Sequence, residues 1–136
     1  MSLFVTVDPV YLIELGRKVN TVRGRHPSAA SFVKYMAEAM KDGWGWLFVD
    51  LDDERKMVAG AAVTLQRAES LGNAAWLDFA WSEQKALSIE NLAAIERFVK
   101  EVLKVDILRI EVKRGFDALQ REYGFAEISR VMEKKL

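Results

Sequence analysis

The stretch AAWLDFAWSEQKALSIENLAAIERFVKEVLK, from Ala74 to Lys104, decides the fold of this chain. It reads as an apolar strand over residues 74–82, a short polar turn and an amphipathic helix. The apolar side of that helix is predicted to consist of Leu92, Ile95, Val99, Val102 and Leu103. A strand that enters a helix through so short a turn directs backbone N–H groups beyond the strand end. Anionic cofactors commonly bind there in α/β folds.

Two further helices are predicted before this stretch. Asp8 is the expected N-cap of the first helix, Pro9 is its first helical residue, and apolar residues recur at helical spacing as far as Val19. Ser28 is the expected N-cap of the second helix, which Gly43 ends.

Five runs of residues before residue 113 predict strands. Residues 44–51, 57–66 and 74–82 are rich in aromatic and β-branched side chains and are separated by polar turns, which predicts a three-stranded antiparallel meander. Residues 3–7 form a short apolar run typical of an edge strand. Residues 107–112 follow a helix, so this strand should lie parallel to the preceding one through a right-handed crossover.

The remaining residues complete the predicted fold. Residues 116–123 predict a short helix ended by Gly124, and residues 125–133 predict one last strand or two. Gly60, inside a strand, predicts either a bulge or a close backbone approach. Residues 1–136 are therefore expected to form a single α/β domain with a mixed, mostly antiparallel sheet flanked by helices.

Composition limits the class of protein and its partners. The chain of 136 residues has 20 basic and 20 acidic side chains, so no global field attracts nucleic acid or an anionic membrane. Cysteine is absent, which fits a reducing compartment and predicts a cytoplasmic protein. No signal sequence and no apolar run of membrane-spanning length is recognised, so no membrane partner is expected. An exposed strand at a sheet edge would allow a homodimer.

The order strand, two helices, three antiparallel strands, helix, strand, helix, strand resembles the GNAT superfamily of acyl-CoA N-acyltransferases. The segment LQREYGF, residues 119–125, is similar to the L-Y-E-K-x-G-F ending of that family. The resemblance covers nearly the whole chain in topology and a short segment in motif. It implies a GNAT-like domain that uses acetyl-CoA, with a small-molecule or protein amine as the acceptor.

The resemblance also implies a place for the acyl donor. In the family, acyl-CoA lies beside the third strand of the meander, which corresponds here to residues 74–82. The backbone of Phe79, Ala80 and Trp81 would then hold the pantetheine arm. The family's diphosphate turn, Q/R-x-x-G-x-G/A, corresponds to residues 84–89.

This turn departs from the family pattern at two positions. Gln84 matches, and Lys85 and the Ser88 hydroxyl are the other candidates for binding the cofactor. Leu87 and Ile89 stand where the family has small residues. Glycine permits the close backbone approach and the unusual φ values that a phosphate requires, whereas branched side chains restrict both.

Asp78 is the first candidate for a catalytic base, because family members often use a carboxylate on this strand. Period-two alternation predicts Trp76, Asp78 and Ala80 on one face. A carboxylate between apolar neighbours should have a raised pKa, which suits proton abstraction from an amine. The alternative is that Asp78 pairs with an arginine or lysine, or faces solvent. Glu111, on the next strand, is a second candidate with the same alternatives.

The usual general acid of the family, a tyrosine, falls at Gln120 in this register. An amide cannot deliver a proton to a thiolate leaving group. Tyr123 lies about one helical turn away, where it is either a core side chain beside Gly124 or a displaced acid.

Other residues allow two interpretations each. Four tryptophans form either the wall of an acyl pocket or part of the core: Trp44, Trp46, Trp76 and Trp81. Four basic residues form either an anion-binding patch or a solvated surface: Arg17, Lys18, Arg23 and Arg25. His26 has no partner visible in the sequence, and no cluster of metal ligands is found.

Two functions from different classes are therefore expected. The first is an N-acetyltransferase that moves an acetyl group from acetyl-CoA to an amine of unknown identity. The second is a GNAT-fold protein without catalysis that serves as a binding or assembly module, through its tryptophan-bearing sheet. The departures at the turn and at Gln120 weaken the first of these.

Overall fold

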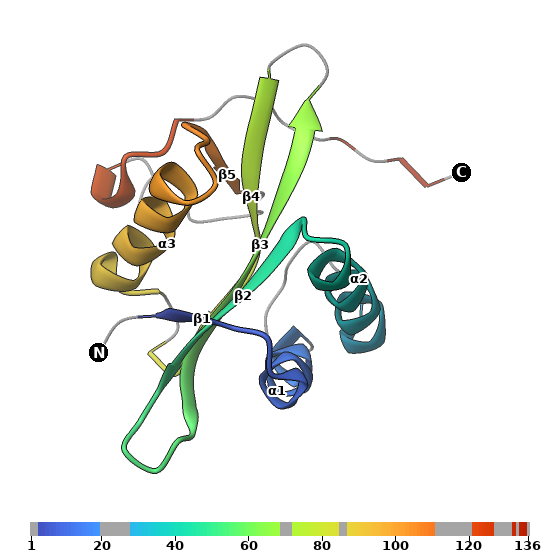
Figure 1. Cartoon of the computed structure of the whole chain (residues 1–136), viewed down its shortest axis with the longest axis vertical. Coiled ribbons are helices and arrows are strands. Elements are labelled where there is room, and N and C mark those ends of the chain that lie inside the picture. Colours follow the sequence, from blue (N-terminus) through green and yellow to red (C-terminus); the bar gives the residue numbers. More distant parts are fainter. Residues whose placement is uncertain are drawn as a thin grey trace.

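The computed structural model describes residues 3–19, 28–68, 72–84, 87–110, 121–126, 132 and 134–135. Its elements in chain order are β1 (Phe4–Thr6), α1 (Pro9–Val19), α2 (Ala29–Lys41), β2 (Gly45–Leu51), β3 (Met57–Ala68), β4 (Gly72–Ser82), α3 (Ile89–Glu101) and β5 (Leu108–Ile110). The strands form one sheet in the order β1-β2-β3-β4-β5. Helices α1 and α2 lie on one side of this sheet, and α3 lies on the other side (Figure 1).

The pairing of the strands agrees with the sequence prediction. Strands β1 to β4 pair antiparallel in chain order, so the three-stranded meander and the preceding edge strand are confirmed. Strand β5 follows α3 and pairs parallel with β4, as a strand–helix–strand crossover requires.

The predicted helix starts are confirmed by hydrogen bonds. The Asp8 carboxylate Oδ1 accepts from the backbone N–H of Val10 at 2.9 Å. The hydroxyl oxygen of Ser28 accepts from the backbone N–H of Ser31 at 3.1 Å, which caps α2. These bonds satisfy donors that the helix itself leaves without a partner.

Each face of the sheet has its own hydrophobic core. The α1–α2-side cluster consists of Leu12, Leu15, Val19, Phe32, Met36, Leu47, Val49, Met57, Ala62 and Phe79. The α3-side cluster consists of Leu3, Phe48, Ala59, Ala61, Val63, Ala75, Leu77, Leu92, Ile95, Val99 and Val105. Side chains of a sheet alternate between its faces, so membership of a cluster tells which way a strand residue points.

One residue of the predicted α3 stripe is not buried. Val102 is 61% exposed, so its assignment to the apolar side was wrong. The reason is that α3 ends at Glu101, and Val102 is its C-cap. Leu92, Ile95 and Val99 are buried as predicted, and Leu103 packs partly buried against the α3-side cluster.

The chain after β5 is described only in part. Residues 121–123 are helical, and Gly124 follows with φ +74, which agrees with the predicted end of a helix at this glycine. The first part of that helix lies outside the described residues, as does most of the predicted strand over residues 125–133.

Gly60 is a point of close approach between the sheet and α1. A Cβ at Gly60 would lie 2.9 Å from Leu15 Cδ1, and the pairing of β3 with both neighbours is regular at this residue. The close-approach alternative is therefore confirmed, and the bulge alternative at Gly60 is wrong.

Gly45 lies still closer to its neighbours. A Cβ there would lie 2.5 Å from Ala39 Cβ and 3.2 Å from the Ala39 carbonyl carbon. Because these atoms belong to the backbone of α2 or are attached to it, they cannot rotate away. We expect Gly45→Ala to lower the free energy of unfolding by about 1–3 kcal/mol, measured by urea denaturation.

The control for this prediction is Gly43→Asn. A Cβ at Gly43 has no atom within 4 Å, and its φ of +81 is one that asparagine tolerates. This variant is expected to lose less than about 1 kcal/mol, typical of a solvent-facing turn. Equal losses in the two variants would contradict the close approach of β2 to α2.

Candidate functional site

The candidate site is centred on a β-bulge in β4. Ala62 of β3 pairs with Phe79, whereas the next residue, Val63, pairs with Leu77. Asp78 is therefore the extra residue of the bulge. A bulge bends its strand and turns one side chain away from regular alternation, and bulges are frequent next to active sites.

A chain of hydrogen bonds holds the Asp78 carboxylate on the α2 side of the sheet. The hydroxyl of Thr64 donates to Asp78 Oδ2. The hydroxyl of Tyr35, on α2, donates to the Thr64 oxygen at 3.5 Å. Asp78 is 5% exposed and Thr64 is fully buried, so both groups lie out of contact with bulk water. The solvent-facing alternative for Asp78 is therefore wrong.

The bulge also changes which residues share a face with Asp78. Phe79 belongs to the α1–α2-side cluster, whereas Ala80 packs against the α3-side cluster. The prediction that Ala80 shares the face of Trp76 and Asp78 was therefore wrong. Its physical reason is the extra residue, since a one-residue shift moves every later side chain to the other face.

Trp76 and Arg109 lie next to Asp78 on the same side. Arg109 is the central residue of β5 and pairs in register with Trp76. Its guanidinium carbon lies 5.9 Å from the centre of the Trp76 ring, which is a cation–π contact. A carboxylate, a guanidinium and an aromatic side chain thus lie on the same side of two neighbouring strands.

The other predicted residues of β4 point into the fold or toward α1. Phe79 is buried, and its ring centre lies 5.5 Å from that of Phe32. Trp81 is half-buried, with Lys18 Nζ 4.5 Å from its ring centre. Any contact of Phe79 with a cofactor would therefore involve its backbone rather than its side chain.

The turn before α3 is built around Ser88. Its hydroxyl oxygen accepts from the backbone N–H of Asn91 at 3.1 Å and caps the helix. Gln84 is exposed, and its backbone N–H donates to the Ser82 hydroxyl at 3.2 Å. Ile89 is 65% exposed.

Leu87 is turned away from this helix start. Its side chain packs partly buried against the α3-side cluster, and its carbonyl oxygen accepts from the Tyr123 hydroxyl at 3.1 Å. Tyr123 packs against the same cluster, so the core interpretation of Tyr123 is the one observed. Its hydroxyl ties the residues before α3 to the helix that ends at Gly124.

Several predicted residues lie outside the described part of the chain. They are Glu111, Lys85, Gln120, Arg23, Arg25 and His26. Their roles stay predictions.

The four tryptophans do not form one surface. Trp46 packs against the α3-side cluster, edge-on to Phe98 at 6.0 Å. Trp44 lies on the opposite side, edge-on to Tyr35 at 5.3 Å. A single aromatic wall made of all four tryptophans is therefore excluded.

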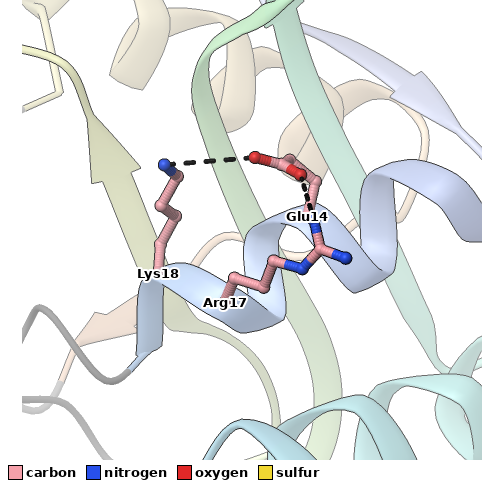
Figure 2. Close-up of polar contacts among 3 residues, drawn as sticks. All are labelled: Glu14, Arg17 and Lys18. Carbon is pink, nitrogen blue, oxygen red and sulfur yellow. Dashed lines mark hydrogen bonds and ion pairs between the residues drawn. The ribbon is translucent and has the colours of Figure 1, made fainter.

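The described part of the basic patch is engaged with α1 itself. Figure 2 shows Glu14 between Arg17 and Lys18, with Arg17 Nη1 at 3.3 Å and Lys18 Nζ at 4.0 Å from its carboxylate oxygens. The Arg17 side chain is 72% exposed, as expected for a solvated surface.

Three residues of the site were missed by sequence reasoning: Tyr35, Thr64 and Arg109. Tyr35 is one aromatic residue within a predicted helix, and Thr64 is one hydroxyl in an apolar run, so neither stands out. Arg109 does carry a signal, because it interrupts the apolar run of a strand predicted to be covered by a helix.

Two other features are absent from the described residues, a membrane-spanning helix and a cluster of metal ligands. No helix in that part of the chain is both long enough and apolar enough to cross a membrane. Within the same ranges, no three metal-ligating side chains come together.

Comparison with known proteins identifies the fold. Neither a family model nor a curated protein matches the sequence. Among solved structures, a predicted acetyltransferase from Clostridium acetobutylicum with acetyl-CoA gives a TM-score of 0.69 at 9% identity, over 98% of this chain and 96% of that one. Aminoglycoside 6'-N-acetyltransferase from Acinetobacter haemolyticus gives a TM-score of 0.69 at 14% identity, over 100% of this chain and 99% of that one.

Glucosamine-6-phosphate N-acetyltransferase from Arabidopsis thaliana gives a TM-score of 0.66 at 13% identity, over 99% of both chains. All three similarities cover essentially the whole chain, including its single sheet and the helices on both faces. The chain therefore has the fold of the GNAT acetyltransferases.

Proposed function

We propose that this protein transfers an acetyl group from acetyl-CoA to an amine, with Asp78 as the general base. The observation that carries the proposal is the buried Asp78 carboxylate, held on a β-bulge by the Thr64 hydroxyl. The fold supports it, because similar structures are an acetyltransferase with acetyl-CoA and two N-acetyltransferases named for amine-bearing sugars. A binding module without catalysis has no need for a carboxylate fixed in this way.

The proposed chemistry needs one proton acceptor and one leaving group. Asp78 takes the proton from the acceptor nitrogen as its lone pair attacks the acetyl carbonyl carbon. The carbon–sulfur bond then breaks, and CoA leaves as a thiolate. Because a thiol is far more acidic than an alcohol, with a pKa of about 8.5 for a cysteine side chain, a thiolate can leave without a tyrosine acid and take its proton from water. Glu111 is the second candidate for the base.

The donor would lie between β4 and the start of α3. The backbone of residues 79–81 would hold the pantetheine arm, and the turn with Gln84, Lys85 and Ser88 would hold the diphosphate. The first N–H groups of a helix point outward without partners in the helix. Here those of Ile89 and Glu90 would face the diphosphate, and Leu87 does not cover them because its side chain packs in the core.

Ser88→Ala is expected to weaken CoA binding about three- to tenfold, because loss of a cap costs about 1 kcal/mol and frays the first turn of α3. The measurement is calorimetric titration with CoA. Ser28→Ala is the matched control, since Ser28 caps α2 with a bond of the same length, 3.1 Å. Both variants should lose similar stability, and only Ser88→Ala should lose affinity. Equal affinity in the two variants would contradict a diphosphate site at α3.

The function itself is tested by incubating the purified protein with acetyl-CoA and a panel of primary amines. Release of free CoA thiol and the mass of the acetylated amine are both measured. The proposal predicts acetyl-CoA-dependent product with at least one small-molecule or peptide amine. Binding of acetyl-CoA without transfer to any amine would favour the inactive binding module.

Two further expectations belong to this proposal. The absence of cysteine fits a cytoplasmic location. A homodimer would form at the outer edge of β1, where Phe4 is 47% exposed and the strand ends the described sheet.

A further inference from the structure

Arg109 is a cation placed on the α2-facing side of the sheet. Its neighbours in β5, Leu108 and Ile110, pack against the α3-side cluster. Because successive side chains of a strand point to opposite faces, Arg109 points to the side of α1 and α2. Its contact with the Trp76 ring, at 5.9 Å, agrees with this direction.

One donor of the Arg109 guanidinium is left unsatisfied by the described part of the protein. Its Nε atom is buried and has no hydrogen-bond partner there. The ion pairs among those residues belong to Arg17, Lys18 and Lys56 and do not include Arg109. A buried donor without a partner is costly, and most native structures avoid it. The cation–π contact alone leaves this cost in place, so a purely structural role explains Arg109 poorly.

Arg109 is also close to the proposed catalytic base. It pairs in register with Trp76, and Asp78 follows two residues later in β4. Neighbouring strands are about 4.8 Å apart and two residues advance a strand by about 6.7 Å, which places the two Cα atoms about 8 Å apart. A carboxylate and a guanidinium thus lie on one side of the sheet, on neighbouring strands whose Cα atoms are about 8 Å apart at these residues.

We propose that the acceptor is an amine that also carries a carboxylate or phosphate group, and that Arg109 binds this anionic group. The inference rests on the proposed function, because Asp78 is taken to receive the amine. The planar guanidinium offers paired donors that match carboxylate and phosphate oxygens. Trp76 holds the guanidinium from one side, so less side-chain freedom is lost when the anion binds.

The first test observes binding without turnover. The Nε–Hε resonance of Arg109 is assigned in ¹⁵N-labelled protein by its loss in Arg109→Gln. The protein is then titrated with two anionic amines, β-alanine and O-phosphoethanolamine. It is also titrated with β-alaninamide and ethanolamine, which keep the amine but lack the carboxylate or phosphate. The two anionic amines are expected to shift this resonance, and the neutral amines are not. Whichever of β-alanine and O-phosphoethanolamine binds more tightly shows whether Arg109 prefers a carboxylate or a phosphate.

The variants give the control. Arg109→Gln is expected to weaken binding of the anionic amine at least about tenfold, because a charge-assisted pair is lost. Arg109→Lys keeps the charge but loses the paired donors of the guanidinium. Its affinity for the anionic amine is expected to lie between those of the wild type and Arg109→Gln. Arg97→Gln, an exposed arginine of α3 on the other face, should bind as wild type does. Unchanged binding in folded Arg109→Gln, or no shift with either anionic amine, would overturn the proposal.

Turnover separates this inference from the proposed function. We expect kcat/KM for the anionic amine to exceed that of its neutral counterpart at least about tenfold, and Arg109→Gln to remove the preference. Anionic amines that bind at Arg109 without being acetylated would support the anion site and contradict the acetyltransferase. Equal acetylation of both members of each pair would overturn the anion site and leave the acetyltransferase intact.

Discussion

Asp78→Asn is expected to lower kcat for acetyl transfer by about 10²- to 10⁴-fold, because an amide cannot accept the amine proton. Asparagine keeps the size of the side chain and can still accept the hydrogen bond that Thr64 donates to Asp78. The fold and the affinity for acetyl-CoA should therefore be retained. The measurement is kcat with the amine that the wild type acetylates fastest, together with a calorimetric Kd for acetyl-CoA.

Asp50→Asn is the matched control for this prediction. Asp50 is also a buried carboxylate of the sheet, 8% exposed, but it lies in β2 near the hairpin turn. Its variant should keep a rate within about threefold of wild type, as expected of a residue that takes no part in proton transfer. If Asp78→Asn keeps a comparable rate, Asp78 is not the base, and Glu111 becomes the candidate to replace.

Phe32→Ala is expected to lower the free energy of unfolding by about 3–5 kcal/mol, the range for truncating a fully buried phenylalanine. Phe32 is fully buried between α2 and the sheet, and its ring packs at 60° against Phe79. Truncation leaves a cavity directly under β4, where Phe79 follows the bulged Asp78. The measurement is urea unfolding followed by circular dichroism.

Ile13→Ala provides the comparison for that loss. Ile13 is a large apolar side chain of α1, but it is 49% exposed. Its truncation removes little buried surface, so a change of less than about 1 kcal/mol is expected. Similar losses in the two variants would contradict the packing of α2 on β4 through Phe32.

Much of this fold could be predicted from local sequence signals. Asp8 and Ser28 are capping residues whose hydrogen bonds depend only on the next few residues, and both bonds are observed. The meander was predictable because strand periodicity and polar turns are also local. Val102 was misassigned because a helical stripe does not tell where the helix ends.

The site was less predictable, because it depends on contacts between distant residues. The bulge at Asp78 arises from how β3 and β4 pair, so simple alternation placed Ala80 on the wrong face. The Thr64 and Tyr35 contacts join residues that are 14 and 29 positions from their partners. Arg109 could have been found from the sequence as a charge in an apolar strand. Its position on the strand next to that of Asp78 could not.

The most direct test of the central claim is calorimetric titration of the purified wild-type protein with acetyl-CoA. An acetyltransferase is expected to bind it with a Kd between about 1 μM and 1 mM, the usual range of substrate affinities. Saturable binding in that range, at one site per chain, is the predicted result. No heat of binding at acetyl-CoA concentrations well above about 1 mM would contradict the account, because the glycine-free turn before α3 would then not hold the cofactor.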